Sequence, residues 1–261
     1  MKYPKKSLGQ NFLIDNNIIK KIINSVEIKN KNIVEIGPGK GALTKEILKK
    51  KPKSLILIEK DFQLFNELKN KYSDLKNIKV INNDILKFDI EGILKKKSLI
   101  FGNLPYNISS QILVKFIKFK NWPPHFTSLI FMFQKELGEK IICDSPSPNY
   151  GRISILRKFR LKFKNKFFVS PNCFFPKPKV NSMVIHFVPY QEKSYSFKRI
   201  TNLEKITNIF FSKKRKIIKK SLEKLINKNN IRKLSNINLR SRPAEIKPEI
   251  YYKITELYEG Q

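Results

Sequence analysis

One short stretch carries the residue types needed to hold a planar base that bears an amine. The tetrad Asn103-Leu104-Pro105-Tyr106 follows an apolar run over 98–101 and Gly102, and an apolar-periodic segment begins soon after Asn107. This order predicts a strand, a tight polar turn and the start of a helix. Ligands of α/β proteins bind at the carboxyl ends of strands. An amide, a proline-stiffened carbonyl and an aromatic ring are therefore expected at a ligand site.

Two carboxylates end the neighbouring predicted strands over 54–59 and 78–85. Glu59 comes about twenty residues after a glycine turn, where an acidic residue of a nucleoside-binding sheet accepts hydrogen bonds from ribose hydroxyls. Asp84 is positioned to meet an adenine amine. Each carboxylate alone could be only a turn or cap residue. Together, the glycine turn, Glu59 and Asp84 at the ends of three successive predicted strands favour an adenosine ligand.

The glycine turn itself narrows the choice of ligand. Gly37, Gly39 and Gly41 follow a predicted strand over 32–36 with the spacing G-x-G-x-G, and not the G-x-G-x-x-G of dinucleotide sites. No Lys-Ser or Lys-Thr pair closes the turn as a phosphate-binding P-loop requires. Glu35 before the turn favours a cationic or hydroxylated ligand over a pyrophosphate. We infer S-adenosylmethionine rather than NAD.

The elements that must position these residues alternate between strand and helix as far as residue 190. Further strands are predicted over 127–133, 161–169 and 180–188, with helices from Asp15, over 42–48, after Asn107, over 134–142 and after Arg152. Three prolines stiffen the loop 170–179 and exclude it from a strand ladder. Phe174 or Phe175 is then either held where a base could stack or buried as an anchor for a long connection. Helices are predicted over 203–211, 213–227 and 248–258. The predicted domains are residues 1–190 and a small helical domain, residues 191–261.

Composition sets the class of partner. A chain of 261 residues that is 41% hydrophobic can bury a core, and its formal net charge of +33 suits a polyanion such as RNA. Drift toward A/T-rich codons is an alternative source of part of the lysine excess. Two cysteines and two histidines make neither a disulfide framework nor a zinc site. No membrane-spanning run or signal segment is found, so we expect a cytoplasmic protein. We also expect it to be a monomer without a metal.

The motifs together resemble one family. Gly9-Gln10-Asn11-Phe12-Leu13, Glu35-Ile36-Gly37-Pro38-Gly39, Glu59, Asp84, the tetrad at 103–106 and the proline loop at 171–178 occur in the order and spacing of the ribosomal RNA adenine dimethyltransferases. That family modifies two adjacent adenines near the 3′ end of small-subunit ribosomal RNA. The resemblance implies a class I methyltransferase (Rossmann-like) α/β fold. Its seven-stranded sheet would be mostly parallel with one antiparallel strand, followed by a C-terminal all-helical domain.

The resemblance also implies roles for individual residues. The expected S-adenosyl-L-methionine contacts are Asn11, Leu13, Gly37, Glu59, Asp84 and Asn103. By the resemblance, Tyr106 and Phe174 match the aromatic residues that stack on the target adenine. Our own hypothesis is that the Asn103 oxygen and the main-chain carbonyl of Leu104 or Pro105 accept the two amine hydrogens, so the expected catalytic residues are Asn103, Leu104, Pro105, Tyr106 and Phe174. Basic side chains expected to bind RNA are Lys177, Lys179, Lys214, Arg215 and Lys216. The expected partner is small-subunit ribosomal RNA within an assembling small ribosomal subunit.

Two rival functions follow from the same residues. Related methyltransferases modify large-subunit ribosomal RNA and confer macrolide resistance, but their tetrad tends to read Asn-Ile-Pro-Tyr, whereas position 104 is leucine here. The other rival is a non-catalytic RNA-binding assembly factor on the same fold. The intact tetrad and cofactor residues count against a purely binding role.

Overall fold

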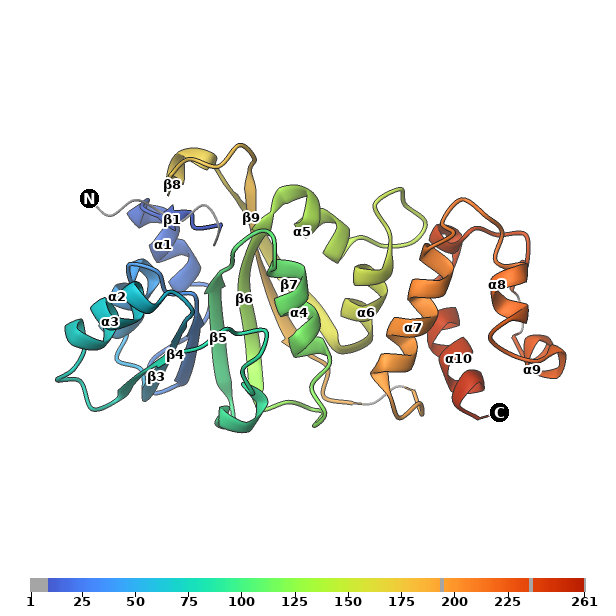
Figure 1. Cartoon of the computed structure of the whole chain (residues 1–261), viewed down its shortest axis with the longest axis horizontal. Coiled ribbons are helices and arrows are strands. Elements are labelled where there is room, and N and C mark those ends of the chain that lie inside the picture. The colour runs from blue at the N-terminus through green and yellow to red at the C-terminus, as the bar shows by residue number, and fades with distance from the viewer. Residues whose placement is uncertain (1–8, 193–194, 235–236, 261) are drawn as a thin grey trace. The chain divides into compact units, whose positions relative to one another are not determined.

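Strands and helices alternate along most of the chain in the computed structural model, which describes residues 9–192, 195–234 and 237–260 (Figure 1). The strands are β1 (Phe12–Leu13), β2 (Asn32–Ile36), β3 (Ser54–Glu59), β4 (Ile78–Asn82), β5 (Ser98–Asn103), β6 (Phe126–Gln134), β7 (Leu161–Val169), β8 (Phe174–Phe175) and β9 (Ser182–Pro189). The helices are α1 (Asn16–Ile23), α2 (Ala42–Lys49), α3 (Phe62–Lys71), α4 (Ser109–Ile117), α5 (Lys135–Ile142), α6 (Arg152–Arg160), α7 (Ile200–Phe211), α8 (Lys219–Glu223), α9 (Lys228–Arg232) and α10 (Pro248–Glu259).

Seven strands form one sheet in the order β4-β3-β2-β5-β6-β9-β7. The pairs β4–β3, β3–β2, β2–β5 and β5–β6 are parallel, and β9 is antiparallel to β6. The predicted fold class, a mostly parallel seven-stranded sheet with one antiparallel strand, is therefore confirmed. Strand order reverses between β2 and β5, and a crevice opens at such a reversal beyond the carboxyl ends of the strands.

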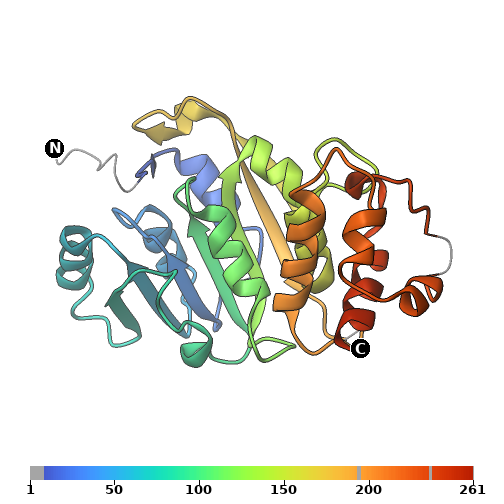
Figure 2. The same ribbon diagram turned by 45° about the vertical axis from the view of Figure 1, so that its right-hand side comes forward.

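Both faces of the sheet are covered by apolar side chains. Leu99 and Phe101 of β5 are buried together with residues of α1, α2 and α3, whereas Ile100 between them points to the other face. In Figure 2, α4 runs across the front of the sheet. The helix α1 starts where the sequence predicts it, next to Asp15. The Asp15 Oδ1 caps the helix by accepting hydrogen bonds from the main-chain N–H groups of Asn17 and Ile18 at 2.8 and 2.9 Å.

The chain divides into two compact units. The first contains residues 1–115, 121–138 and 163–189, and the second contains 116–120, 139–162 and 190–261. The C-terminal segment of the second unit starts at residue 190, near the predicted boundary. The unit also includes the earlier segment 139–162, which contains α6. The assignment of a methyltransferase role to 1–190 and an RNA-binding role to 191–261 stays a prediction.

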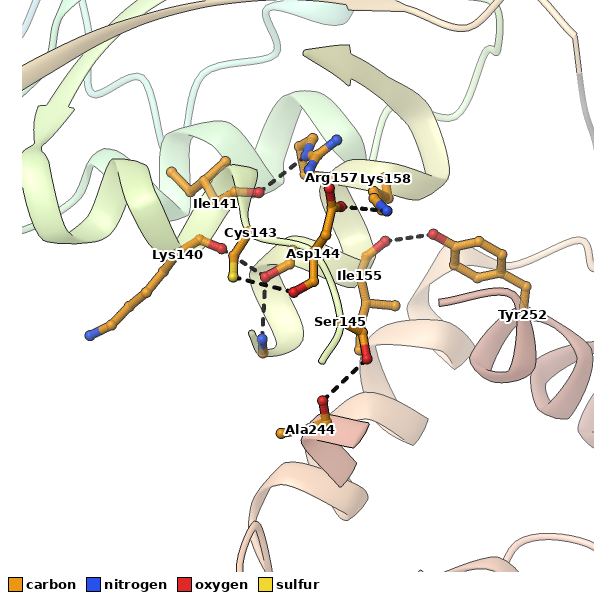
Figure 3. Close-up of polar contacts among 12 residues, drawn as sticks. Lys140, Ile141, Cys143, Asp144, Ser145, Ile155, Arg157, Lys158, Ala244 and Tyr252 are labelled. Atoms are coloured by element: carbon orange, nitrogen blue, oxygen red, sulfur yellow. Dashed lines mark hydrogen bonds and ion pairs between the residues drawn. The ribbon is translucent and has the colours of Figure 1, made fainter. Parts of the chain in front are cut away.

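Hydrogen bonds join the segment 139–162 of the second unit to its C-terminal segment (Figure 3). Tyr252 on α10 donates its hydroxyl to the Ile155 carbonyl at 3.0 Å, and Ser145 Oγ donates to the Ala244 carbonyl at 3.2 Å. Arg157 is buried and donates its Nε to the Ile141 carbonyl at 3.1 Å. The Tyr252 and Ser145 bonds thus join residues 139–162 to the C-terminal part of the unit, and the Arg157 bond ties α6 to α5 within that segment.

Three predictions about local structure need correction. The helix predicted over 213–227 is only the short α8, and Lys214, Arg215 and Lys216 lie in a turn before it. The strand predicted over 78–85 ends at Asn82, so Asp84 lies beyond the sheet. The proline loop does contain a ladder, since β8 pairs with β1, with Phe12 opposite Phe175 and Leu13 opposite Phe174. The sequence did not indicate this pairing because each strand has only two residues.

Candidate active site

A cavity of about 310 Å³ lies where the crevice was expected, beyond the ends of β2, β3 and β5. Chain segments that are far apart in the sequence contribute to its lining, all of them within the first compact unit. The predicted residues that line it are Asn11, Leu13, Gly37, Glu59, Asp84, Asn103, Leu104, Pro105 and Tyr106. The predicted cofactor residues and the tetrad therefore share one cavity.

The Asn103 side chain is oriented by the main chain. Its Nδ2 donates a hydrogen bond to the carbonyl oxygen of Asn11 at 3.0 Å. This bond turns the amide nitrogen toward the Asn11 carbonyl, so the amide oxygen is the atom able to accept a hydrogen bond from a ligand amine. Asn103 is the last residue of β5, and the tetrad continues from it along the cavity wall.

The rest of the tetrad is held by its neighbours. The Tyr106 hydroxyl makes a hydrogen bond of 2.5 Å with Ser182 Oγ at the start of β9, and Ser109 Oγ donates to the Tyr106 carbonyl at 3.1 Å. Burial raises the pKa of Tyr106 above its ordinary value although the Ser182 bond opposes this, so the phenol stays neutral. A Cβ on residue 102 would come within 2.5 Å of the buried Leu104 side chain, so any larger residue before the tetrad would force that side chain to move.

Glu59 ties the glycine turn to the end of β3. Its Oε2 accepts from the Gly39 main-chain N–H at 3.1 Å, and its Oε1 accepts from the Asp61 N–H at 2.8 Å. Burial raises the pKa of Glu59, and these two N–H groups act against that rise. A carboxylate oxygen has two lone pairs, so both oxygens can still accept from hydroxyl groups in the cavity.

Asp84 is held by a cation and a main-chain group. Its Oδ2 lies 2.9 Å from the Lys60 ammonium nitrogen, and its Oδ1 accepts from the Leu86 N–H at 2.9 Å. Burial alone would raise the pKa of Asp84, but these two contacts hold it below its ordinary value. Lys60 and Ile85 line the cavity next to these acids and were missed by the sequence reasoning, although both directly follow a predicted acidic residue.

Glu35 is a buried acid in the cavity wall, with 1% of its surface exposed. Thr44 Oγ1 donates to Glu35 Oε2 at 2.6 Å. Burial raises the pKa of Glu35 to about 7, partly offset by the Thr44 bond and increased by the nearby charge of Glu59. Glu35 therefore changes protonation near neutral pH.

The segment 9–14 closes one side of the cavity. Gln10 Nε2 donates to Asp61 Oδ2 at 3.2 Å, and the Phe12 ring lies against the glycine turn, where a Cβ on Gly39 would come within 3.0 Å of it. Together with the Asn103 bond to Asn11, these contacts fasten the segment to the start of α3, the glycine turn and the tetrad.

The two phenylalanines of β8 have opposite environments. Phe174, predicted to stack on the target base, is 3% exposed and belongs to the core cluster that includes Leu13. Phe175 is 47% exposed and lines the cavity. Neighbouring residues of a strand point to opposite sides. The structure thus brings Phe175, and not Phe174, to the cavity.

A second recess adjoins the tetrad. Gly9, Asn11, Tyr106 and Asn107 line it together with Gln134, the last residue of β6. Gln134 is the strand partner of Ser182, which bonds the Tyr106 hydroxyl. Gln134 and Asn107 were not predicted as site residues. The signals that could have found them were the position of Asn107 directly after the tetrad and that of Gln134 at the end of an apolar strand, within a segment that also shares the family resemblance.

The predicted RNA-binding residues fall in two places. Lys177 and Lys179 are exposed on the loop between β8 and β9 of the first unit, and Lys214, Arg215 and Lys216 are exposed in the second unit. Lys214 Nζ donates to the Pro148 carbonyl at 2.9 Å.

Over the described ranges, no cluster of His, Cys, Asp and Glu suits a metal ion, and none of the described helices has the length and apolar character needed to cross a bilayer.

Comparison with known proteins decides the family. The family model described as ribosomal RNA adenine dimethylase matches residues 1–259. The chain belongs to this family. A ribosomal RNA small subunit methyltransferase A of Pelagibacter ubique (strain HTCC1062) is 45% identical over 256 residues, covering 98% of this chain and 97% of that protein. A protein of the same name from Malacoplasma penetrans (strain HF-2) is 39% identical over 257 residues, covering 97% of this chain and 91% of that protein.

Solved structures agree with membership of the ribosomal RNA adenine dimethylase family. A dimethyladenosine transferase from Plasmodium falciparum is 26% identical with a TM-score of 0.74, covering 93% of this chain and 95% of that one. The 23S rRNA methyltransferase ErmE is 22% identical with a TM-score of 0.70, covering 95% of this chain and all of that one, and this likeness shows the fold alone.

The cavity also suits the methyl donor used by ribosomal RNA adenine dimethylases. Gly37 lines it with a φ of +63°, and a Cβ added there would meet no atom within 4 Å, so that space is open to a ligand. Hydroxyl-accepting carboxylate oxygens of Glu59 lie in the same wall as the apolar side chains of Leu13, Ile85 and Leu104. The residues thus fit the ribose and the planar base of an adenosine ligand.

Proposed function

We propose that this protein dimethylates the exocyclic amines of two adjacent adenines near the 3′ end of small-subunit ribosomal RNA, using S-adenosyl-L-methionine. The observation that carries the proposal is the Asn103 amide. Its nitrogen is bound to the Asn11 carbonyl at 3.0 Å, and its oxygen is left to accept from an amine at the cavity that also holds Glu59 and Asp84. The relatives named small subunit methyltransferase A support this substrate.

The residues act by positioning and by polarisation. An adenine amine is a weak nucleophile because its lone pair is delocalised into the ring. The Asn103 oxygen and the carbonyl of Leu104 or Pro105 accept the two amine hydrogens, which turns the lone pair toward the donor and stabilises positive charge that develops on nitrogen. The bound donor supplies an electrophilic methyl group. No strong general base is needed, since the alkylated ammonium is acidic.

The rings hold the base flat. In this proposal Tyr106 stacks on the flipped adenine, fixed by its bond to Ser182. Phe175 takes the role of the second ring, because it is the exposed member of β8 and lines the cavity. Glu59 accepts from the ribose hydroxyls of the donor, and Asp84 accepts from its adenine amine.

The cellular setting is part of the proposal. We place the reaction on an assembling small ribosomal subunit in the cytoplasm, with the protein acting as a monomer. The basic residues Lys177, Lys179, Lys214, Arg215 and Lys216 contact RNA phosphates. Their exposure and the net charge of +33 support this role.

One experiment separates the proposed function from its rivals. Purified small and large ribosomal subunits that lack adenine dimethylation are incubated with the protein and radiolabelled methyl donor. Label in two adjacent adenines of the small-subunit RNA supports the proposal. Label in large-subunit RNA would favour the macrolide-resistance type, and tight binding to small subunits without label would favour an assembly factor.

A further inference from the structure

An exposed aromatic ring on the outer edge of the sheet has no role in the cavity described above. Phe168 of β7 is 53% exposed, and the ammonium nitrogen of Lys135 lies 5.4 Å from its ring centroid. Val169 beside it is buried in the core. Because side chains alternate along a strand, Lys164, Lys166 and Phe168 share the outward face of β7, and both lysines are exposed.

The topology brings this ring near the tetrad. β9 separates β7 from β6 in the sheet. The Tyr190 N–H donates to the Arg160 carbonyl at 2.9 Å, which sets the start of β7 beside the end of β9. The end of β7, with Phe168, therefore lies beside the start of β9, with Ser182.

Ser182 is the residue that links this edge to the site. It bonds the Tyr106 hydroxyl and pairs with Gln134, which lines the recess beside the tetrad. Two strand spacings, about 10 Å, separate β6 from β7. Lys135 follows Gln134 directly and holds its cation at the Phe168 ring, so residues from the recess to the ring form a continuous path.

We propose that Phe168 is a stacking platform for an unpaired nucleotide that flanks the target adenine, with Lys164 and Lys166 contacting the phosphates on either side of it. This proposal rests on the proposed function. A base can stack on an exposed ring whatever its identity, and lysines beside the ring attract the backbone. A ring next to a cation on a half-exposed edge strand has the chemistry of a single-stranded RNA contact.

The test uses the intact protein and small-subunit ribosomal RNA lacking the modification. Equilibrium binding to this RNA and methyl transfer to small subunits are measured for Phe168→Leu, Phe168→Trp and Phe168→Tyr. Leu75→Ala is the matched control, since Leu75 is 43% exposed next to β4 at the opposite edge of the sheet. Phe168→Leu should weaken RNA binding about ten-fold and raise KM for the subunit, with kcat and donor binding unchanged.

The aromatic variants decide the reason for the loss. Phe168→Trp and Phe168→Tyr should bind RNA within about two-fold of the natural protein, because each keeps a ring for stacking. Unchanged RNA affinity in Phe168→Leu overturns the platform, even where methyl transfer succeeds. A change of oligomeric state in Phe168→Leu with unchanged RNA affinity would assign this edge to a contact between copies instead. Failure of the natural protein to methylate any subunit would count against the proposed function and leave the binding comparison decisive for Phe168.

Discussion

At the scale of single residues, the amide of Asn103 separates chemistry from binding. Replacing Asn103 by Ala removes the acceptor that the Asn11 carbonyl orients. We expect methyl transfer to fall by about 100-fold or more, the loss seen when a single polarising group is removed, while donor binding weakens only partly. Radiolabelled transfer to small subunits and calorimetric donor binding measure the two effects. Asn32→Ala is the control, because the Asn32 amide lies at the end of β2 that is remote from the cavity. Near-normal turnover in Asn103→Ala would refute the assignment.

The protonation of Glu35 gives a second test at this scale. The folded-state pKa of about 7 lies above the ordinary value of 4.5. The neutral acid therefore stabilises the fold at low pH, and that contribution is lost as the pH rises through about 7. Glu35→Gln stays neutral, and its amide oxygen can still accept from Thr44. The unfolding free energy of the variant relative to the natural protein should rise by about 2 to 3 kcal/mol between about pH 5 and pH 8. Urea denaturation measures it, and a pH-independent difference would contradict the titration.

At the scale of elements, β8 decides which ring faces the ligand. Phe175→Ala should raise KM for the RNA substrate and leave stability nearly unchanged, because Phe175 is half-exposed at the cavity. Phe174→Ala should instead lower the unfolding free energy by about 3 to 5 kcal/mol, as expected for a buried phenylalanine. Thermal denaturation and subunit methylation kinetics distinguish the two. A stable Phe174→Ala variant with impaired RNA affinity would reverse the assignment.

The strands differ in how well their positions could be predicted from the sequence. The apolar run 54–59 and the segment 161–169, where lysines alternate with other residues, each have one dominant strand pattern, so β3 and β7 were predicted with the observed bounds. The acids and the tetrad were located because they follow such strands directly. The pairing of β1 with β8 depends on tertiary contacts between residues over 150 positions apart, and a two-residue strand has no periodicity to reveal it. For the same reason the sequence could not decide between Phe174 and Phe175, and the resemblance pointed to the buried one.

Lysine-rich segments were the other point at which local patterns misled. The run from 213 to 227 contains good helix formers, but helix forms only over Lys219–Glu223. Ile218 is buried and its N–H donates to the Ser241 carbonyl at 2.9 Å, a tertiary bond outside any helical ladder. Such a bond cannot be read from propensity. The turn it leaves at 212–216 exposes Lys214, Arg215 and Lys216 together.

At the scale of the whole molecule, a net charge of +33 raises the question of which cations contact RNA. The double variant Arg215→Glu and Lys216→Glu should weaken binding to small-subunit RNA and make the slope of log K against log salt shallower by about 1 for each phosphate that is no longer neutralised. Lys95→Glu with Lys96→Glu changes the net charge equally at an exposed turn before β5, near the amino ends of the strands, and serves as the control. If only the variant at 215 and 216 changes the slope, this turn contacts phosphate. Equal changes in both would mean that total charge, such as compositional drift supplies, is what draws the protein to RNA.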